Sequence, residues 1–377
     1  MNWKAIRGAA LLHLLSVAVC VLGAQAFASG VCPGGPVTVT LYSPASGTHP
    51  TPVMVSATAT STGGAISGYV VYTDVPTAGT NAYQINATSL NAWVILPLLQ
   101  NGGAQTQHVY VRAWDVNGNC NDTPTVTITA SGTVVPTPLG GYVVFDNADD
   151  DSGGDGGVTH GWGYCGDCAG GNPSNRSPPA FNQSPNIDGG SLLLSMTGGN
   201  NADALWWYKV GPQNQYRNFL WDFWFRTGSN VIPSKTQAVE FDLFQEISGL
   251  EYMFGSQCEF QQSVWQGWRQ DTGAWVNAIP NTATDANPTG TAIPCTPFAP
   301  GVWHQAQYFV QRQFNGRLLY GNVTIDGVTT QWNINAPNAA KAWADVLGVN
   351  HQLDVKYGYS GTTTLQEWVD LERLTVW

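Results

Sequence analysis

Short runs of alternating or β-branched residues, separated by clusters of Gly, Pro, Asn and Ser, recur along almost the whole chain. Runs of this kind, bounded by turn-forming residues, are typical of antiparallel β-sandwiches. The composition agrees, because 43 glycines and only 10% charged residues in a chain of 377 disfavour helices. The sequence therefore predicts an all-β fold, with one short helix expected at 336–346. The clearest predicted strands are 37–41, 53–59, 66–72, 93–98, 108–114 and 125–129, then 190–196, 219–225, 238–244, 303–313, 318–325 and 368–376.

A stretch rich in Pro and Gly at 133–141 divides the chain. We expect a first domain at 32–132, a semi-rigid linker at 133–141 and a second domain at 142–377. Every Glu and 13 of the 16 Trp residues lie in the second part, so binding or catalytic chemistry is expected there and the first domain is expected to be a spacer. Because few contacts usually cross such a linker, residues 140–377 are expected to fold alone.

The first residues have the features of a signal peptide. Lys4 and Arg7 precede an apolar run at 9–23, and small residues at positions 24 and 26 offer a cleavage site. The run is short for a membrane span, and no later segment is apolar enough to cross a bilayer. Residues 1–26 are therefore predicted to be removed, and the protein to be secreted, either extracellular or on the cell surface. Cys20 leaves a lipid anchor as the less favoured alternative.

Six cysteines follow Cys20, an even number for an oxidising compartment, and this favours three disulfides. Their spacing suggests that one pair brackets the first domain, one closes a short loop and one staples a long loop. For the short-loop pair, half of a zinc site or a redox pair is the alternative. The expected pairs are Cys32–Cys120, Cys165–Cys168 and Cys258–Cys295.

The charge and the acidic residues limit the partners. A net charge of −11 argues against nucleic acid or an anionic membrane as a partner. Asp149, Asp150, Asp151 and Asp155 lie among glycines and could wrap a structural Ca²⁺, although they lack the order of an EF-hand loop. A solvated acidic loop is the favoured interpretation. The metal content, the oligomeric state and the particular polysaccharide do not follow from the sequence.

Two resemblances to known families accompany this pattern. Ser-Pro-Ala-Ser-Gly at 43–47, the strand at 52–59 and Val-Tyr-Val-Arg-Ala-Trp-Asp at 109–115 resemble bacterial immunoglobulin-like modules. Trp303-His304, the strand at 308–312, the residues 318–320 and Asp326-Gly327 resemble the concanavalin A-like lectin and glucanase group. The resemblances imply an immunoglobulin-like sandwich followed by a concanavalin A-like jelly roll.

The segment at 239–245, Val-Glu-Phe-Asp-Leu-Phe-Gln, is the strongest candidate for a site. On a strand, Glu240 and Asp242 project from the same face, and two carboxylates there are costly unless they are solvated, paired or functional. The segment resembles the catalytic strand of laminarinase- and lichenase-type glycoside hydrolases, which implies Glu240 as nucleophile and Asp242 as its helper. Gln245, or Phe244 without a bulge, stands where the resemblance implies a Glu acid/base, and neither can donate the required proton.

A groove could still bind glycans without cleaving them. Glu240, Asp242 and Gln245 offer hydrogen bonds to sugar hydroxyls, and aromatic rings can stack on sugar faces. The aromatic candidates are Trp206, Trp207, Trp265 and Trp268, of which adjacent Trp206 and Trp207 must face opposite sides of a strand. A structural role for the carboxylate pair is the alternative.

Three functions follow in order of preference. The first is a secreted polysaccharide-binding protein whose jelly roll carries a glycan cleft. The second is a glycoside hydrolase acting on a β-glucan-type polysaccharide through Glu240, which requires a second carboxyl group nearby. The third is a structural or adhesive surface protein without a glycan site.

Overall fold

The computed structural model describes residues 32, 34–73, 83–85, 87–96, 98, 103–139, 141–166, 171–172, 174–282, 284, 289–313, 316–341 and 344–377. The predicted signal peptide, Cys20 and the Cys168 half of the expected short-loop disulfide lie outside these residues. The described regular elements are β-strands and one short 3-10 helix, η1 (Ala148–Asp150), so the all-β prediction is confirmed. No described helix has the length and apolar character needed to cross a bilayer.

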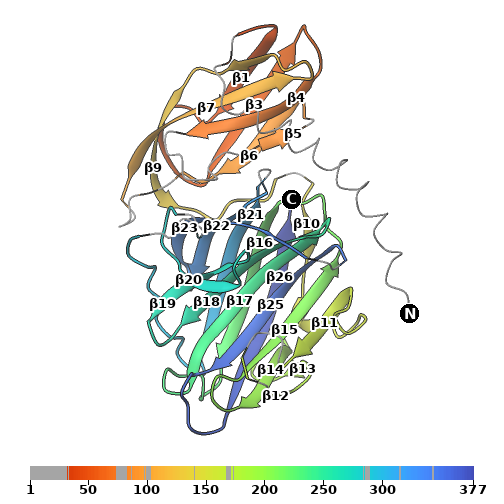
Figure 1. Cartoon of the computed structure of the whole chain (residues 1–377), viewed down its shortest axis with the longest axis vertical. Coiled ribbons are helices and arrows are strands. Elements are labelled where there is room, and N and C mark those ends of the chain that lie inside the picture. The colour runs from red at the N-terminus through yellow and green to blue at the C-terminus, as the bar shows by residue number, and fades with distance from the viewer. Residues whose placement is uncertain are drawn as a thin grey trace, which may run out of the picture.

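The strands before residue 134 form one sandwich, drawn in orange and yellow at the top of Figure 1. One sheet has the order β1-β3-β6 and the other the order β2-β9-β7-β4-β5, with β8 paired to β7. Alternate residues of β3 (Val53–Ser61) and β7 (Gln105–Asp115) point inward and form its core. The remaining strands are β1 (Val37–Ser43), β2 (Gly47–Thr51), β4 (Ile66–Thr73), β5 (Tyr83–Ile85), β6 (Ser89–Val94), β8 (Cys120–Asp122) and β9 (Val126–Thr133).

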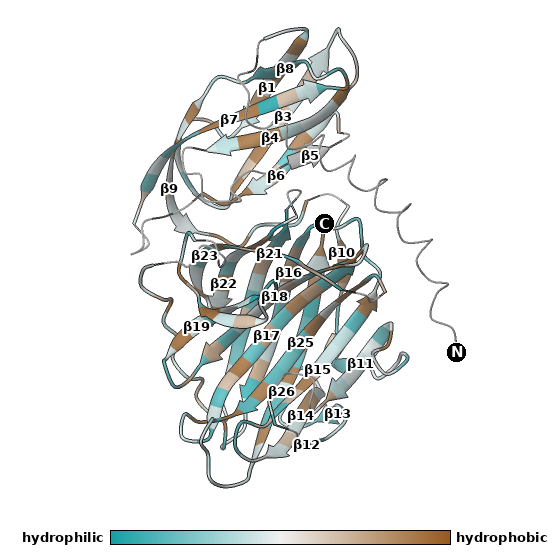
Figure 2. Ribbon diagram, viewed as in Figure 1, coloured by the Kyte–Doolittle hydropathy of each residue, from teal (hydrophilic) through white to brown (hydrophobic). Residues whose placement is uncertain are grey.

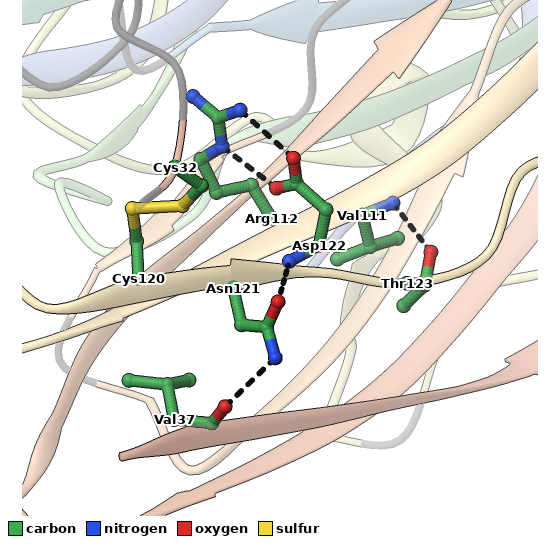
Figure 3. A network of polar contacts seen from close by, with 8 residues as sticks. All are labelled: Cys32, Val37, Val111, Arg112, Cys120, Asn121, Asp122 and Thr123. Carbon is green, nitrogen blue, oxygen red and sulfur yellow. Dashed lines mark hydrogen bonds and ion pairs between the residues drawn. A yellow bond between two sulfur atoms is a disulfide. The ribbon is translucent and has the colours of Figure 1, made fainter. Parts of the chain in front are cut away.

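A disulfide and a polar network close this first sandwich (Figure 3). Cys32 is bonded to Cys120, as the spacing predicted, and ties the start of the sandwich to β8. Beside it, Arg112 holds Asp122 through two hydrogen bonds of 2.7 and 2.9 Å. Asn121 Nδ2 donates to the carbonyl of Val37 at 3.0 Å, which fastens β8 to β1. The entry of the sandwich and β8 are therefore joined covalently and by hydrogen bonds.

The strands after residue 142 form a second and larger sandwich of two sheets. The back sheet is nine-stranded, with the order β12-β14-β26-β16-β21-β22-β23 and with β10 and β13 at its margin. The front sheet is eight-stranded, with the order β11-β15-β25-β17-β18-β19-β20 and with β24 beside β18. The back strands are β10 (Val143–Phe145), β12 (Asn175–Arg176), β13 (Ala180–Gln183), β14 (Ser191–Gly198), β16 (Asn218–Thr227), β21 (Trp303–Arg312), β22 (Leu318–Ile325), β23 (Val328–Ala336) and β26 (Thr363–Val376). The front strands are β11 (His160–Cys165), β15 (Asp203–Gly211), β17 (Thr236–Ile247), β18 (Leu250–Glu259), β19 (Val264–Arg269), β20 (Ala274–Asn277), β24 (Ala339–Ala340) and β25 (Val346–Val355).

Alternation along the strands builds the core between these two sheets. Hydrophobic and hydrophilic segments alternate along β17 and β25 in Figure 2, as expected of strands with one face on a core. On β16, Trp221, Phe223 and Phe225 are all buried and pack in one row, which confirms their predicted core position. The Cys258–Cys295 disulfide, also predicted, pins the loop after β20 to β18.

The helix expected at 336–346 is not formed in the described residues. Ala336 ends β23, β24 covers Ala339–Ala340, and Val346 begins β25. The segment has helix-forming composition, but pairing of β24 with Leu250 and Glu251 of β18 satisfies its backbone instead. Tertiary pairing has overridden local propensity here.

The expectation that few contacts cross the linker was wrong. Ile95 of the first sandwich is buried with Phe309 and Leu319, which point outward from the back sheet. The buried side chain of Gln331 on β23 accepts from the backbone N–H of Leu98 and donates to the carbonyl of Leu96, both at 2.9 Å. The first sandwich therefore covers apolar surface of the second.

Candidate functional site

The β17 strand divides its side chains between core and outer face. Val239, Phe241 and Leu243 point into the core. Because alternate residues of a strand point to opposite sides, Glu240 and Asp242 lie on the outer face of the front sheet. The predicted pairing of these two carboxyl groups on one face is therefore confirmed by the register of β17 with both of its neighbours.

Carboxamide side chains flank the two carboxyl groups on this outer face. Glu240 pairs with Gln257 of β18 on one side and with Gln352 of β25 on the other. Gln257 Nε2 donates in turn to Gln266 Oε1 on β19. The row Gln352, Glu240, Gln257 and Gln266 crosses four strands, β25, β17, β18 and β19, and Asp242 pairs with Asn350 beside it. Such groups both donate and accept hydrogen bonds.

A second carboxyl group, not anticipated from the sequence, lies beside Glu240. The Glu240 side chain forms a hydrogen bond with that of Asp354 on β25. Burial and then the charge of Asp354 raise the pKa of Glu240 well above its usual value, and burial raises the pKa of Asp354 as well. Two carboxyl groups in contact hold one proton between them, because both cannot ionise at this separation. A shared proton therefore stabilises this pair relative to its doubly ionised form.

Asp242 is held differently from Glu240. Its Oδ1 accepts from the backbone N–H of Ser256 at 3.1 Å, and its carboxyl group is hydrogen-bonded to Asn350. Burial raises the pKa of Asp242 to about 7, although these hydrogen bonds act in the opposite direction. Only 3% of Glu240 and 5% of Asp242 is exposed, so little of either carboxyl group is accessible from the solvent.

Two Trp side chains lie on this outer face, one on each side of the carboxyl groups. Trp207 pairs with Asn350 across β15 and β25, and its indole N–H donates to the carbonyl of Gly157 at 2.8 Å. Trp268 of β19 packs over Gly255, and its ring meets Trp275 edge-on at 5.1 Å. A Cβ atom at Gly163 would lie 2.5 Å from the Trp207 ring, and one at Gly255 would lie 2.7 Å from Trp268 Cβ. Both rings therefore occupy space that only glycine leaves free.

Three other predicted site residues lie elsewhere. Trp206 and Trp265 point into the core, with 0% and 5% of their surface exposed, so neither lines the outer face. Gln245 is fully buried on the opposite side of β17, where it accepts from Arg312 Nε at 2.5 Å and donates to the carbonyl of Gln213. β17 has no bulge between Glu240 and Ile247, so Phe244, and not Gln245, follows Asp242 on the outer face.

Five polar residues of this face were not predicted from the sequence: Asn350, Gln352, Asp354, Gln257 and Gln266. For Asn350, Gln352 and Asp354 the signal was a polar residue at every second position, with Val349 and Leu353 among the residues between, which marks a strand with one polar face. The pattern indicates the face but not the neighbouring strand. Only the pairing of β25 with β17 places Asp354 beside Glu240.

Carboxylates of the acidic loop at 146–157 accept hydrogen bonds from other groups of the protein. Asp155 accepts hydrogen bonds from the backbone N–H groups of Val158, Thr159 and His160 and from the Thr159 hydroxyl. Together these hydrogen bonds lower the pKa of Asp155. Asp151 accepts from the hydroxyl of Tyr208 at 2.7 Å. In the part of the chain that the structure describes, no three His, Cys, Asp or Glu side chains are grouped to hold a metal ion.

Stability is expected to fall as the pH rises from about 5 to 8. Burial raises the pKa of Asp242, Glu246 and Asp149 to about 7 each, whereas the unfolded chain titrates near its usual values of roughly 4. The folded state therefore holds more protons between these limits, and raising the pH through 7 removes that stabilisation. A fall of about 5 °C or more in melting temperature is expected, since one pKa unit at one group is about 1.4 kcal/mol. Calorimetry at pH 5 and pH 8 measures it, and an equal or higher value at pH 8 would contradict these protonation states.

Comparison with known proteins identifies no family. No family model matches the chain, and no curated protein matches it. Among solved structures, carbohydrate-binding modules of a β-sandwich superfamily, described as promiscuous in specificity, match at 11% identity over 91% of this chain and 98% of theirs, with a TM-score of 0.32. Arcelin-5, a lectin-like defence protein from Phaseolus vulgaris, matches at 10% identity over 62% of this chain and 97% of its own, with a TM-score of 0.33.

A third match is a family 11 carbohydrate-binding module from Clostridium thermocellum, solved with a β-1,3-1,4-mixed-linked tetrasaccharide. It is 11% identical over 62% of this chain and 94% of its own, with a TM-score of 0.28. At such values the likenesses say nothing of function. The structure itself defines a protein of two β-sandwiches, with a polar and aromatic face on the front sheet.

Proposed function

We propose that the outer face of the front sheet binds a polysaccharide. The observation that carries the proposal is the combination on one face of Trp207 and Trp268 with a row of acids and amides between them. Sugars need both kinds of group, since their ring faces stack on aromatic rings and their hydroxyls exchange hydrogen bonds with carboxyl and amide groups. Neither group alone would favour a glycan.

A neutral polysaccharide of the β-glucan type fits the site best. The acidic residues Glu240, Asp242, Asp354 and Asp203 all lie on this face, so an anionic polysaccharide would meet like charge. The amides of Gln257, Gln266 and Gln352 carry no charge and suit neutral hydroxyls. We therefore place a neutral chain along the row that crosses β25, β17, β18 and β19.

Retention on insoluble β-glucan tests the proposal. The wild-type protein is expected to bind, and Trp207→Ala and Trp268→Ala are each expected to weaken binding by roughly tenfold, since a central Trp carries a large share of the energy of an interface. Glu240→Gln is expected to weaken binding only a few-fold, because the amide keeps the shape and one acceptor. Depletion isotherms with each variant give the dissociation constants.

Trp224→Ala provides the matched control. Trp224 lies on β16 of the back sheet, where it pairs with Gln305, and it is partly exposed like Trp207. It is expected to bind as the wild type does. Absence of retention on any polysaccharide, or equal loss in Trp224→Ala and Trp207→Ala, would favour a structural or adhesive protein instead.

A glycoside hydrolase that uses Glu240 is the second candidate, and the nearby carboxyl group of Asp354 favours it. Retaining hydrolysis needs two carboxyl groups about 5–5.5 Å apart, and inverting hydrolysis needs more. Glu240 and Asp354 are in hydrogen-bond contact, which is closer than either mechanism uses. The binding function is therefore preferred. Steady release of reducing ends by the wild type, lost in Glu240→Gln and in Asp354→Asn, would establish hydrolysis instead.

We infer further that the mature protein acts outside the cell. The Cys32–Cys120 and Cys258–Cys295 disulfides support this inference, since such bonds persist in oxidising compartments. A signal peptide at 1–26 remains a prediction, and N-terminal sequencing of the protein recovered from the medium tests it. Phe27 is the expected first residue, whereas a secreted protein that still begins at Met1 would contradict cleavage.

A further inference from the structure

The outer face of the back sheet carries a second group of polar and aromatic side chains, on the opposite side of the sandwich from the carboxyl groups. Phe225 of β16 points into the core, so the next residue, Arg226, points outward. Arg226 pairs with Trp368 of β26 on one side and with Trp303 of β21 on the other. Since side chains at paired positions lie about 5 Å apart, Arg226 has an indole neighbour on each side. Gln366 lies two residues before Trp368 on the same face, and we call these four residues the back-face cluster.

Arg226 has no acidic partner, although the chain has 25 acidic residues and only 14 Lys and Arg. It makes no hydrogen bond or ion pair with another described residue, and its guanidinium lies over the Trp368 ring at 5.8 Å. Its Nε is buried, whereas neither Nη atom is among the buried nitrogens without a partner, so the forked end of the side chain is open to solvent. A guanidinium fork with two open donors matches a carboxylate, which accepts from both at once.

Two neighbouring groups are open in the same way. The indole N–H of Trp303 and the side-chain amide of Gln366 have no partner in the described part of the chain, and neither is buried. Glycines border the cluster: a Cβ atom at Gly301 would lie 3.4 Å from Arg226 Nη2, and one at Gly228 would lie 3.6 Å from the Trp368 ring. The cluster therefore presents open hydrogen-bond donors beside aromatic surface, and small residues leave the approach to them free.

Carboxylates elsewhere on this face are engaged with other groups. Asp222 lies four residues before Arg226, about 13 Å along the strand. It accepts from the side chains of Gln305 and Gln307 at 2.8 and 2.7 Å. Asp146 is held by Arg373 at 2.8 Å. An anion at Arg226 therefore meets a charge of opposite sign, whereas on the front sheet it would meet Glu240 and its acidic neighbours.

We propose that the back-face cluster is a second glycan site, which binds a polysaccharide of hexuronic acids. One carboxylate of the polymer accepts from the two Nη atoms of Arg226, and a sugar ring lies against Trp303. Hydroxyls of that ring accept from the indole N–H of Trp303 and from Gln366. Inorganic sulfate or phosphate would fill the fork but offers no ring to the indole, and a neutral sugar offers no charge to the guanidinium. This site is independent of the face of the front sheet and does not require that face to bind.

Calorimetric titration of the full-length protein with trigalacturonate tests the proposal. Its methyl ester keeps the sugar rings and removes the charges, and is expected to bind about tenfold more weakly or less, since hydrogen bonds to charged groups are the stronger ones. Arg226→Gln is expected to reduce binding of the acid to the level of the ester. Arg226→Lys keeps the charge but lacks the fork, and is expected to weaken binding by about threefold. Trp303→Ala is expected to weaken binding of acid and ester alike, because contact with the ring does not depend on the charge.

Arg373→Gln is the matched control, because it removes the same charge from the same sheet but the fork of Arg373 is already occupied by Asp146. It is expected to bind trigalacturonate as the wild type does, and circular dichroism checks that each variant is folded. No binding of trigalacturonate, equal binding of acid and ester, or equal losses in Arg226→Gln and Arg373→Gln would overturn the proposal. Sulfate that competes at the same concentration as trigalacturonate would also overturn it, by showing a site for any anion. Loss of β-glucan retention in folded Arg226→Gln would do so too, because the two sites would then be one.

Discussion

Residues 140–377 produced without the first sandwich are expected to self-associate or precipitate, whereas the full chain stays monodisperse. Removing the first sandwich exposes Phe309 and Leu319, of which 1% and 2% are exposed in the whole protein, together with their neighbours Leu220 and Trp377. A contiguous apolar patch of this kind on an isolated sandwich drives association. Size-exclusion chromatography with light scattering, run on both proteins at equal concentration, gives the result.

The matched control is the same fragment with Phe309→Thr and Leu319→Thr. Both positions point outward from the back sheet, and Thr keeps the preference for strands while removing the apolar surface. This variant is expected to be monomeric. In the full chain the same two substitutions are expected to destabilise the protein by roughly 3 kcal/mol or more, because each deletes buried apolar atoms. An unmodified fragment as soluble and monomeric as the full chain would restore the interpretation of the first sandwich as a spacer.

His351→Leu is expected to lower the free energy of unfolding by about 3–5 kcal/mol, the usual cost of breaking a buried ion pair. His351 is fully buried in the core of the second sandwich, with Glu367 on Nδ1 and Glu372 on Nε2, each at 3.3 Å. Burial acts to lower the pKa of His351, but the two carboxylates outweigh it and raise that pKa to about 10. Without the imidazolium, both carboxyl groups are left in an apolar core.

Urea denaturation of His351→Leu measures this loss, with Arg373→Ala as the control. Arg373 makes an ion pair with Asp146 at 2.8 Å, but the two side chains are 53% and 46% exposed, so the loss there is expected to be below about 1 kcal/mol. Adding Glu367→Gln to His351→Leu is expected to recover part of the stability, because an amide carries no charge to bury. Equal, small losses in His351→Leu and Arg373→Ala would show that the buried group is not charged in the folded protein.

Local features of this protein could be predicted, and features that depend on strand pairing could not. Glu240 and Asp242 share a face because of a two-residue period, which the sequence contains in full. Asp354 lies more than 100 residues after Glu240 in the chain, and its place beside Glu240 depends on the pairing of β17 with β25. The choice between Gln245 and Phe244 likewise depended on a bulge, and β17 has none there.

The sequence does contain an indication of the interface between the two sandwiches. Leu318-Leu319-Tyr320 is a continuous apolar run, and such a run indicates a strand buried on both faces. Leu318 and Tyr320 point into the core, and Leu319 points toward Ile95 of the first sandwich. The composition of the linker alone predicted that the two sandwiches fold independently of each other. The residues that determine whether they do lie on strands far from the linker.

The contact of Ile95 with Phe309 and Leu319 also has a mechanical meaning. Two modules joined only by a flexible tether sample many mutual orientations, and a force or a bound polymer acting on one reaches the other only when the tether is taut. Here the packed contact and the hydrogen bonds of Gln331 restrict the angle between the modules, and we expect them to rotate in solution as one body. A glycan held on the front sheet would consequently be presented in a constant direction relative to the first sandwich.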